Sequence, residues 1–297
     1  MHSQQENPYS QYMFLQQMFN PGYTGTTEFT EVSLFHRSRW SQVEGAPRSY
    51  GLNLNIPGQR RVGVGASIEK DAIGIYEETA LTFNSSYEFK PTASTNLSLG
   101  LSAGLNWLRS DVNLLNVYHS AELLDKMSFN EMSPSIGFGA FFHTDKFYVG
   151  YSGSQVFLSP TVTRQEVVFP QQKIHHNLTG GYVFESEKIK IKPAALLKYA
   201  DGAPLNVNIS ANVMFREKYV TGLSYHLKAG GSVILGLHLD EGLFVGYNVE
   251  LPYANNQRIN FLSHEIMVRL NIESLIGYKR KKTDLPLSTE PSSNRFF

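Results

Sequence analysis

The segment Thr95–Leu108 constrains the fold more than any other stretch of this sequence. Its apolar residues recur at every second position from Leu97 to Trp107, and small or polar residues stand between them. Alternate side chains of a β-strand point to opposite faces, so this strand would have one long leucine face and one polar face. A strand that crosses a bilayer needs about 9–11 residues, with apolar side chains toward lipid and aromatic ones at the interfaces. If the pattern recurs, the segment predicts a membrane-spanning strand.

The same alternation does recur along the chain, and it predicts about fourteen strands. They are expected at Phe29–Trp40, Ser49–Ile56, Val62–Glu69, Thr79–Phe89, Thr95–Leu108, Ile136–His143, Phe147–Gly153, Ile174–Glu185, Lys188–Tyr199, Leu205–Phe215, Tyr219–Leu227, Val233–Leu239, Leu243–Leu251 and His264–Ile272. An even number of this size is typical of single-chain outer-membrane barrels. We therefore expect an all-β protein, a transmembrane antiparallel β-barrel of about 14 strands.

The connections between these strands sort by length, as they do in membrane barrels. If the first strand runs outward, the inner connections are all tight: Pro57–Arg61, Lys90–Ser94, Thr144–Lys146, Ser186–Glu187, Arg216–Lys218 and Asp240–Gly242. The outer ones include every long connection: Ser41–Pro47, Lys70–Glu77, Arg109–Met132, Ser154–Gln172, Ala200–Pro204, Lys228–Ser232 and Pro252–Asn260. A soluble stack of hairpins has no reason to sort in this way. Within Arg109–Met132, the segment Leu114–Met127 is a candidate short helix.

Composition agrees with a barrel and excludes several other classes. Lys plus Arg and Asp plus Glu both number 26, and this zero formal charge argues against broad binding of nucleic acid. The chain has no cysteine, so disulfides and thiol-bound metals are excluded. Mean hydropathy is −0.25, which a barrel tolerates because half of each strand faces the lumen. The first residues lack the basic and apolar regions of a signal peptide, so we expect the numbering of a mature or engineered chain.

The two ends of the chain differ from the strands. Residues 1–27 are rich in Gln and Asn, and we expect them to form an arm that plugs the barrel through Tyr9, Tyr12, Phe14, Phe19, Pro21 and Tyr23. A surface arm is the alternative. Residues 273–297 carry the basic run Lys279–Lys282 and then Pro, Ser and Thr, and predict a flexible periplasmic tail. The expected domains are thus the arm (1–27), the barrel (28–272) and the tail (273–297).

Several motifs in this order resemble the PorP/SprF family of the Bacteroidetes type IX secretion system. They are Tyr9–Tyr12, Asn20-Pro21-Gly22-Tyr23-Thr24-Gly25, Arg39-Trp40 followed by Gly45-Ala46-Pro47, His264-Glu265-Ile266 and the closing Arg295-Phe296-Phe297. The family usually has Asn-Pro-Ala-Tyr-Ala-Gly at the second motif, so Gly22 and Thr24 depart from it.

The resemblance implies an outer-membrane barrel of the secretion and gliding machinery. The expected strand directions put both termini in the periplasm. Its implied function is to bind the C-terminal domain of a secreted cargo, such as an adhesin, and to anchor it at the cell surface. The implied partners are that cargo domain, other type IX secretion or gliding components and the bilayer, without nucleic acid. Other members resemble structural components that link the apparatus to the periplasmic ring and peptidoglycan.

The two longest outer connections are the expected partner-binding surface, because apolar loops are costly in water and suggest a buried interface. The candidate residues are Leu114, Leu115, Val117, Tyr118, Val156, Phe157, Leu158, Val167, Val168 and Phe169. Alternatively these loops fold inward as lids. A second functional hypothesis is a channel or transporter for a hydrophobic small molecule.

We expect no enzyme, cofactor or metal site. His175 and His176 are adjacent on a strand and point to opposite faces, so they do not chelate one ion as a pair. No spacing singles out a serine, histidine and acid that would converge as a hydrolase triad. The pairs Gly63/Gly65 and Gly137/Gly139 lie on lumen faces, where glycine allows curvature or close packing.

Overall fold

A computed structural model describes residues 11–41, 43–58, 61–110, 129–157, 163–164, 167–168, 174–227, 230–240, 242–252 and 262–276. Within these residues, one 15-stranded antiparallel sheet contains fourteen long strands and the two-residue β11. The long strands are β1 (Glu31–Ser38), β2 (Arg48–Ile56), β3 (Val62–Ile73), β4 (Tyr76–Thr92), β5 (Thr95–Ser110), β6 (Phe129–His143), β7 (Phe147–Phe157), β10 (His175–Tyr182), β12 (Ile189–Ala200), β13 (Asn206–Phe215), β14 (Tyr219–His226), β15 (Gly230–Asp240), β16 (Leu243–Pro252) and β17 (Ser263–Asn271).

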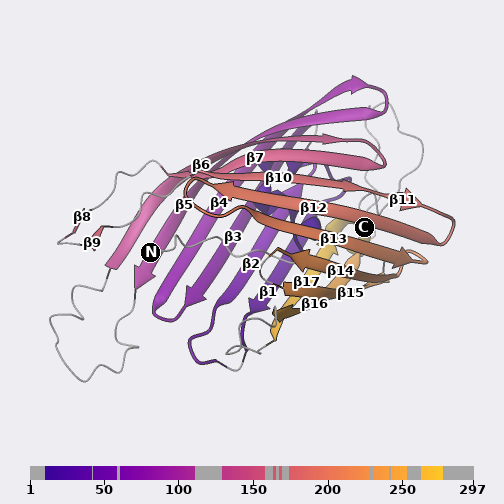
Figure 1. Ribbon diagram of the computed structural model, residues 1–297. Helices are drawn as coiled ribbons and strands as arrows, with labels where there is room; N and C mark the ends of the chain where they lie inside the picture. Colours follow the sequence, from indigo (N-terminus) through magenta and orange to yellow (C-terminus); the bar gives the residue numbers. More distant parts are fainter. Residues whose placement is uncertain are drawn as a thin grey trace.

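The sheet closes on itself as a barrel (Figure 1). Each strand pairs with its neighbours in the chain, β1 pairs with β17, and β10 pairs with both β7 and β12. β11 (Phe184–Glu185) follows β10 after Val183 and pairs with β12. The predicted antiparallel barrel is therefore confirmed. Within the described residues, no helix is long and apolar enough to cross a membrane.

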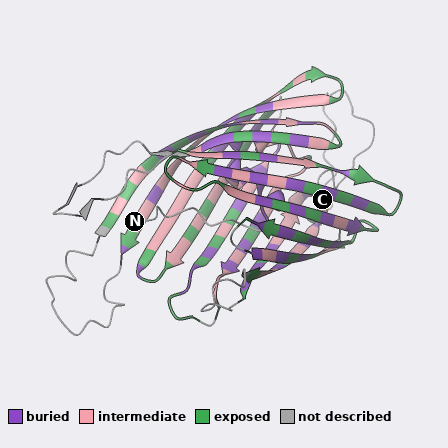
Figure 2. Cartoon of the chain, viewed as in Figure 1, coloured by how far each residue is buried: buried purple, intermediate pink, exposed green. Residues whose placement is uncertain are grey.

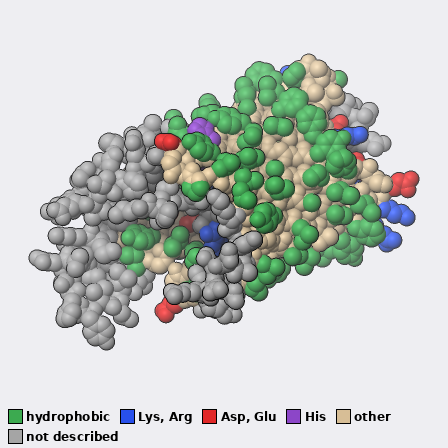
Figure 3. Space-filling model, viewed as in Figure 1, with side chains coloured by type: hydrophobic (Ala, Val, Ile, Leu, Met, Phe, Trp, Pro, Cys, Tyr) green, Lys and Arg blue, Asp and Glu red, His purple; other side chains and the backbone are tan. Residues whose placement is uncertain are grey.

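Strand β5 shows the expected two faces. Leu99 and Leu101 are 46% and 69% exposed on the outer wall, whereas Ser98 and Asn106 are buried on the inner one. Many of the other strands repeat this pattern, so buried residues alternate with more exposed ones along many arrows in Figure 2, and apolar side chains dominate the described outer surface in Figure 3. Polar lumen residues and an apolar outer belt are what a bilayer requires of a spanning barrel. The leucine face of β5 is therefore its lipid face.

The predicted loop Lys70–Glu77 is wrong. β3 continues to Ile73 and β4 begins at Tyr76, so the connection is a two-residue turn with Gly74 at φ 59°. Glycine adopts this left-handed conformation without steric cost. Lys70 and Glu77 form a diagonal ion pair across the two strands, with 3.1 Å between Lys70 Nζ and Glu77 Oε1. In the sequence alone, these charged residues resemble those of a loop.

Other strands also extend beyond their apolar alternation. β4 reaches Thr92, β5 reaches Ser110, β6 begins at Phe129 and β7 ends at Phe157. Backbone pairing needs no apolar side chain, so polar strand ends continue the ladder past the lipid belt. The expected helix Leu114–Met127 lies wholly within residues 111–128, outside the described residues. Between β7 and β10, β8 (Thr163–Arg164) and β9 (Val167–Val168) pair as a separate two-stranded sheet.

The described helical segments are short. They are η1 (Tyr12–Phe14), α1 (Gln16–Phe19), η2 (Pro21–Tyr23) and α3 (Ile272–Leu275). The flexible tail was expected from Glu273, but Glu273 belongs to α3. Its carboxylate accepts hydrogen bonds from the Thr30 backbone N–H (2.7 Å) and hydroxyl (2.8 Å), and the Asn271 side chain caps this helical turn. The rest of the predicted tail, from residue 277, lies outside the described residues.

Candidate functional site in the barrel lumen

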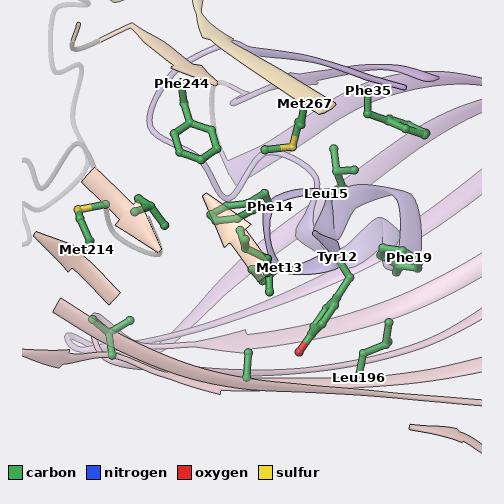
Figure 4. Close-up of a cluster of buried hydrophobic side chains, with 14 residues drawn as sticks. Tyr12, Met13, Phe14, Leu15, Phe19, Phe35, Leu196, Met214, Phe244 and Met267 are labelled. Carbon is green, nitrogen blue, oxygen red and sulfur yellow. The ribbon is translucent and has the colours of Figure 1, made fainter. Parts of the chain in front are cut away.

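Residues 11–25, which we call the inner segment, lie inside the barrel. Tyr12 and Leu15 are each only 1% exposed. Figure 4 shows the segment among side chains from several strands. The shared buried cluster comprises Tyr12, Met13, Phe14, Leu15 and Phe19 of the inner segment with Phe35, Val183, Ala194, Leu196, Met214, Val220, Ile234, Phe244 and Met267. Apolar lumen residues therefore gather where the segment packs.

Hydrogen bonds attach the inner segment to opposite sides of the wall. The Tyr12 hydroxyl lies 3.1 Å from Ser210 Oγ on β13, and Gln17 Nε2 donates to the Leu54 carbonyl on β2 at 3.0 Å. Further contacts come from β4, β6 and β7, where Ser86 donates to Thr24 O, Asn20 Nδ2 donates to Ala140 O and Ser152 donates to Phe19 O. A segment bound from so many strands crosses the lumen and does not line one side of it.

The Asn20-Pro21-Gly22 turn is fixed by its own chemistry. Asn20 has extended backbone angles, and its side-chain oxygen accepts a 2.8 Å hydrogen bond from the Gly22 N–H, which is an N-cap. Pro21 then occupies the first helical position, where its missing N–H costs nothing. The Tyr23 ring meets Phe141 of β6 edge to face at 5.3 Å.

Glycines of the wall allow this turn to approach the strands. Gly100 and Gly139 are directly opposite each other on β5 and β6. A Cβ at Gly100 would overlap the Pro21 carbonyl, and one at Gly139 would overlap the Asn20 side chain. The lumen glycines whose Cβ would meet the inner segment are Gly63, Gly65, Gly100, Gly139, Gly150 and Gly246. Close packing, one of the two roles expected of lumen glycines, is thus observed at Gly63, Gly65 and Gly139.

Charged side chains of the lumen are paired or lie on aromatic rings. Arg37 of β1 contacts Glu250 of β16 at 2.5 Å and Glu265 of β17 at 3.9 Å. Glu265 in turn accepts the Gln11 N–H at 3.3 Å, which attaches the start of the described chain to this cluster. Lys192, fully buried on β12, has its Nζ 3.5 Å from the Met13 carbonyl and 5.6 Å from the Phe14 ring centroid. Such partners are what buried charges require.

The structure places the predicted residues unevenly. Tyr12, Phe14, Phe19 and Pro21 are buried in the lumen and Tyr23 is half-buried there. Among the predicted partner residues, Val156 and Phe157 end β7, and Val167–Val168 is β9. Those outside the described residues are Tyr9, Leu114, Leu115, Val117, Tyr118, Leu158 and Phe169.

The Arg37–Glu250–Glu265 cluster was not predicted. The sequence contains a signal for it, Arg37 on the polar face of a spanning strand, because such charged residues need partners. The sequence does not identify the partner, since Arg37 and Glu250 are 213 residues apart. His264 faces outward and hydrogen-bonds to Tyr247 at 2.7 Å, and His176 stacks on Tyr151 and Tyr199. Among the described residues, no group of three or more His, Asp or Glu is arranged to hold a metal ion.

The sequence profile of one family, described as type IX secretion system membrane protein PorP/SprF, matches residues 1–270. No curated protein matches the chain. Similar solved structures include the CymD monoaromatic hydrocarbon channel (TM-score 0.49, 12% identity, 89% of this chain and 92% of the channel) and KdgM porin (TM-score 0.39, 10% identity, 81% and 98%). A mutant of the Rh. blastica porin has TM-score 0.37 and 9% identity over 82% of this chain and 98% of the porin.

Proposed function

This chain belongs to the PorP/SprF family of type IX secretion system membrane proteins, and from that membership we propose that it is a non-enzymatic anchor in the outer membrane. In this proposal it binds the C-terminal domain of a secreted cargo, such as an adhesin, and holds it at the cell surface. Other secretion or gliding components would assemble around it. The family match and the closed barrel establish the membrane protein, and the anchoring role is the step beyond them.

The observation that carries the proposal is the occupied lumen. A channel for small molecules needs a continuous path through the barrel, whereas the inner segment packs against strands on several sides of this one. An anchor needs no such path. It needs a rigid barrel that stays in the membrane and an outer surface that a partner can reach. The inner segment is therefore proposed to be a plug, with residues 1–27 as its full extent.

The proposed orientation puts the tight turns in the periplasm and the long connections outside. Both described ends of the barrel chain meet at the tight-turn end, where Thr30 binds Glu273. This arrangement supports a periplasmic position for the C-terminal end of the barrel, and periplasmic termini at both ends of the chain are part of the proposal. β5 is joined to β6, and β7 to β10, at the other end of the barrel (Figure 1), and we assign the cargo contact to these two connections.

Affinity capture from native membranes tests the anchor. The full chain is expected to recover a secreted protein through its C-terminal domain, identified by mass spectrometry. Replacing Leu114 and Leu115 by serine should lower this recovery at least tenfold, because burying one leucine side chain contributes about 1.5–3 kcal/mol and 1.4 kcal/mol is a tenfold change.

The matched control replaces Leu205 and Leu227 by serine. Both are exposed at the same end of the barrel but border short connections, and recovery should not change. Capture of a periplasmic, peptidoglycan-linked protein without cargo would instead favour the structural-link hypothesis. Recovery of no secretion-system or cell-surface protein would contradict the proposal.

A further inference from the structure

Outward-facing cations gather in one sector of the barrel. The outer wall is otherwise apolar, but Arg48 of β2, Lys70 of β3 and Arg109 of β5 are exposed on it at the end of the long connections. In the fourteen long strands, no other Lys or Arg points outward at this end. Elsewhere this end of the outer wall has stacks of tyrosine and histidine rings, such as Tyr247 with His264 and Tyr151 with His176. The sector is therefore distinct from the rest of the perimeter.

Strand register brings these three cations into two adjacent rows of the sheet. One row across the sheet runs Tyr50, Lys70, Thr79 and Trp107, and the next row toward the rim runs Arg48, Ala72, Glu77 and Arg109. Adjacent strands lie about 4.8 Å apart, so the row from Arg48 to Arg109 spans roughly 14 Å. Glu77, which pairs with Lys70 at 3.1 Å, is the one acidic residue in these two rows. With three basic residues, the two rows have a positive formal charge.

Aromatic side chains fix the depth of this patch. Tyr50 is 45% exposed, and its ring stacks on His36 with 4.5 Å between the ring centroids. Trp107 is half-buried and lies on β5, two strands away from Lys70 on β3. Tyrosine and tryptophan rings of membrane proteins lie at the level of the lipid headgroups. The leucines of β5, which are exposed further along the same face, mark the hydrocarbon beyond them. The cations therefore lie where lipid phosphates lie.

We propose that this rim patch, formed by Arg48, Lys70 and Arg109 with Tyr50 and Trp107, binds the headgroup of an anionic membrane lipid. Guanidinium groups bind phosphate oxygens in a bidentate manner and an ammonium binds them as a point charge. The aromatic rings contact the apolar part of the headgroup region. The bilayer is the occupant because the patch continues the lipid-facing belt and has the charge opposite to that of the headgroup. This inference is independent of the cargo.

Native mass spectrometry of the full chain from micelles with equal phosphatidylglycerol and phosphatidylcholine tests the patch. The unmodified protein is expected to retain phosphatidylglycerol in preference to phosphatidylcholine. The ratio of retained phosphatidylglycerol to phosphatidylcholine should fall more than tenfold in the triple variant Arg48→Gln, Lys70→Gln, Arg109→Gln. It should fall about fivefold in Arg48→Gln alone, because one basic residue near the surface contributes about 1 kcal/mol. The single variant covers the case in which the triple variant fails to fold.

The control variant Lys146→Gln, Lys188→Gln, Lys218→Gln makes the same change of charge in tight turns at the opposite end. It should keep the preference for phosphatidylglycerol. Equal retention by the unmodified protein and the patch variants would overturn the proposal. Equal losses in the patch and control variants, or no lipid preference in the unmodified protein, would overturn it as well.

Discussion

Replacing Leu101 by arginine is expected to prevent the chain from inserting as a folded barrel. Leu101 is the most exposed of the β5 leucines at 69%, and it lies midway along the strand on the outer wall. An arginine at the bilayer midplane of a barrel costs about 2–4 kcal/mol. Refolding into vesicles, followed by the heat-dependent shift in gel migration that reports a folded barrel, measures the effect. Most of the folded band should be lost.

Met132→Arg is the matched control for this insertion test. Met132 is 57% exposed on the same wall, directly opposite Trp107, at the level where the apolar belt ends. The cost of arginine falls to about 0–1 kcal/mol near an interface. This control should therefore insert. Normal assembly of Leu101→Arg would mean that the leucine face of β5 does not meet lipid.

Replacing the neighbouring Gly100 by valine is expected to displace the inner segment and leave the barrel intact. Gly100 faces the lumen, and any Cβ there overlaps the Pro21 carbonyl, which is backbone and has no alternative rotamer. Overpacking costs about 1–3 kcal/mol even where neighbours adjust. The chain has no cysteine, so Met13→Cys provides a single thiol at a position that is 3% exposed. In the Gly100→Val background, an impermeant maleimide should label this thiol at least tenfold faster.

Gly137→Val provides the comparison for the labelling experiment. Gly137 also faces the lumen, on β6, but the atoms nearest to its Cβ would be the rotatable Ser102 hydroxyl and the wall backbone at Gly153 and Ser154, not the inner segment. Labelling of the Met13→Cys thiol should stay slow in this background. If Gly100→Val protects the thiol as well as Gly137→Val does, the contact between Pro21 and β5 does not hold the segment.

Sequence patterns predicted what depends on local periodicity. Leu101 and Ser98 fall on opposite faces because a strand alternates, and the barrel follows from the repetition of that pattern. The turn at Gly74 was missed, because the exposed Lys70 and Glu77 on paired strand ends have the polarity of a loop. Local periodicity also does not predict where a strand ends when its polar end continues past the lipid belt, as β5 does to Ser110.

The lumen site was less accessible to sequence reasoning. The aromatic character of Tyr12 and Phe14 argued against a solvated arm, but their wall partners depend on long-range register. Ser210 is 198 residues from Tyr12 in the sequence. The ion pair between Arg37 and Glu250 likewise forms only after β1 has closed onto β17 and β16. Contacts of this kind are set by barrel closure, which no single segment encodes.

Single-channel conductance in a planar bilayer tests the sealed-barrel proposal most directly. The measurement compares the full chain with a variant that lacks residues 1–25, which leaves every barrel strand in place. The full chain is expected to insert without a steady current, and the shortened variant is expected to conduct steadily through the emptied lumen. A steady current through the full chain, equal to that of the shortened variant, would contradict a barrel that anchors its partner and does not act as a channel.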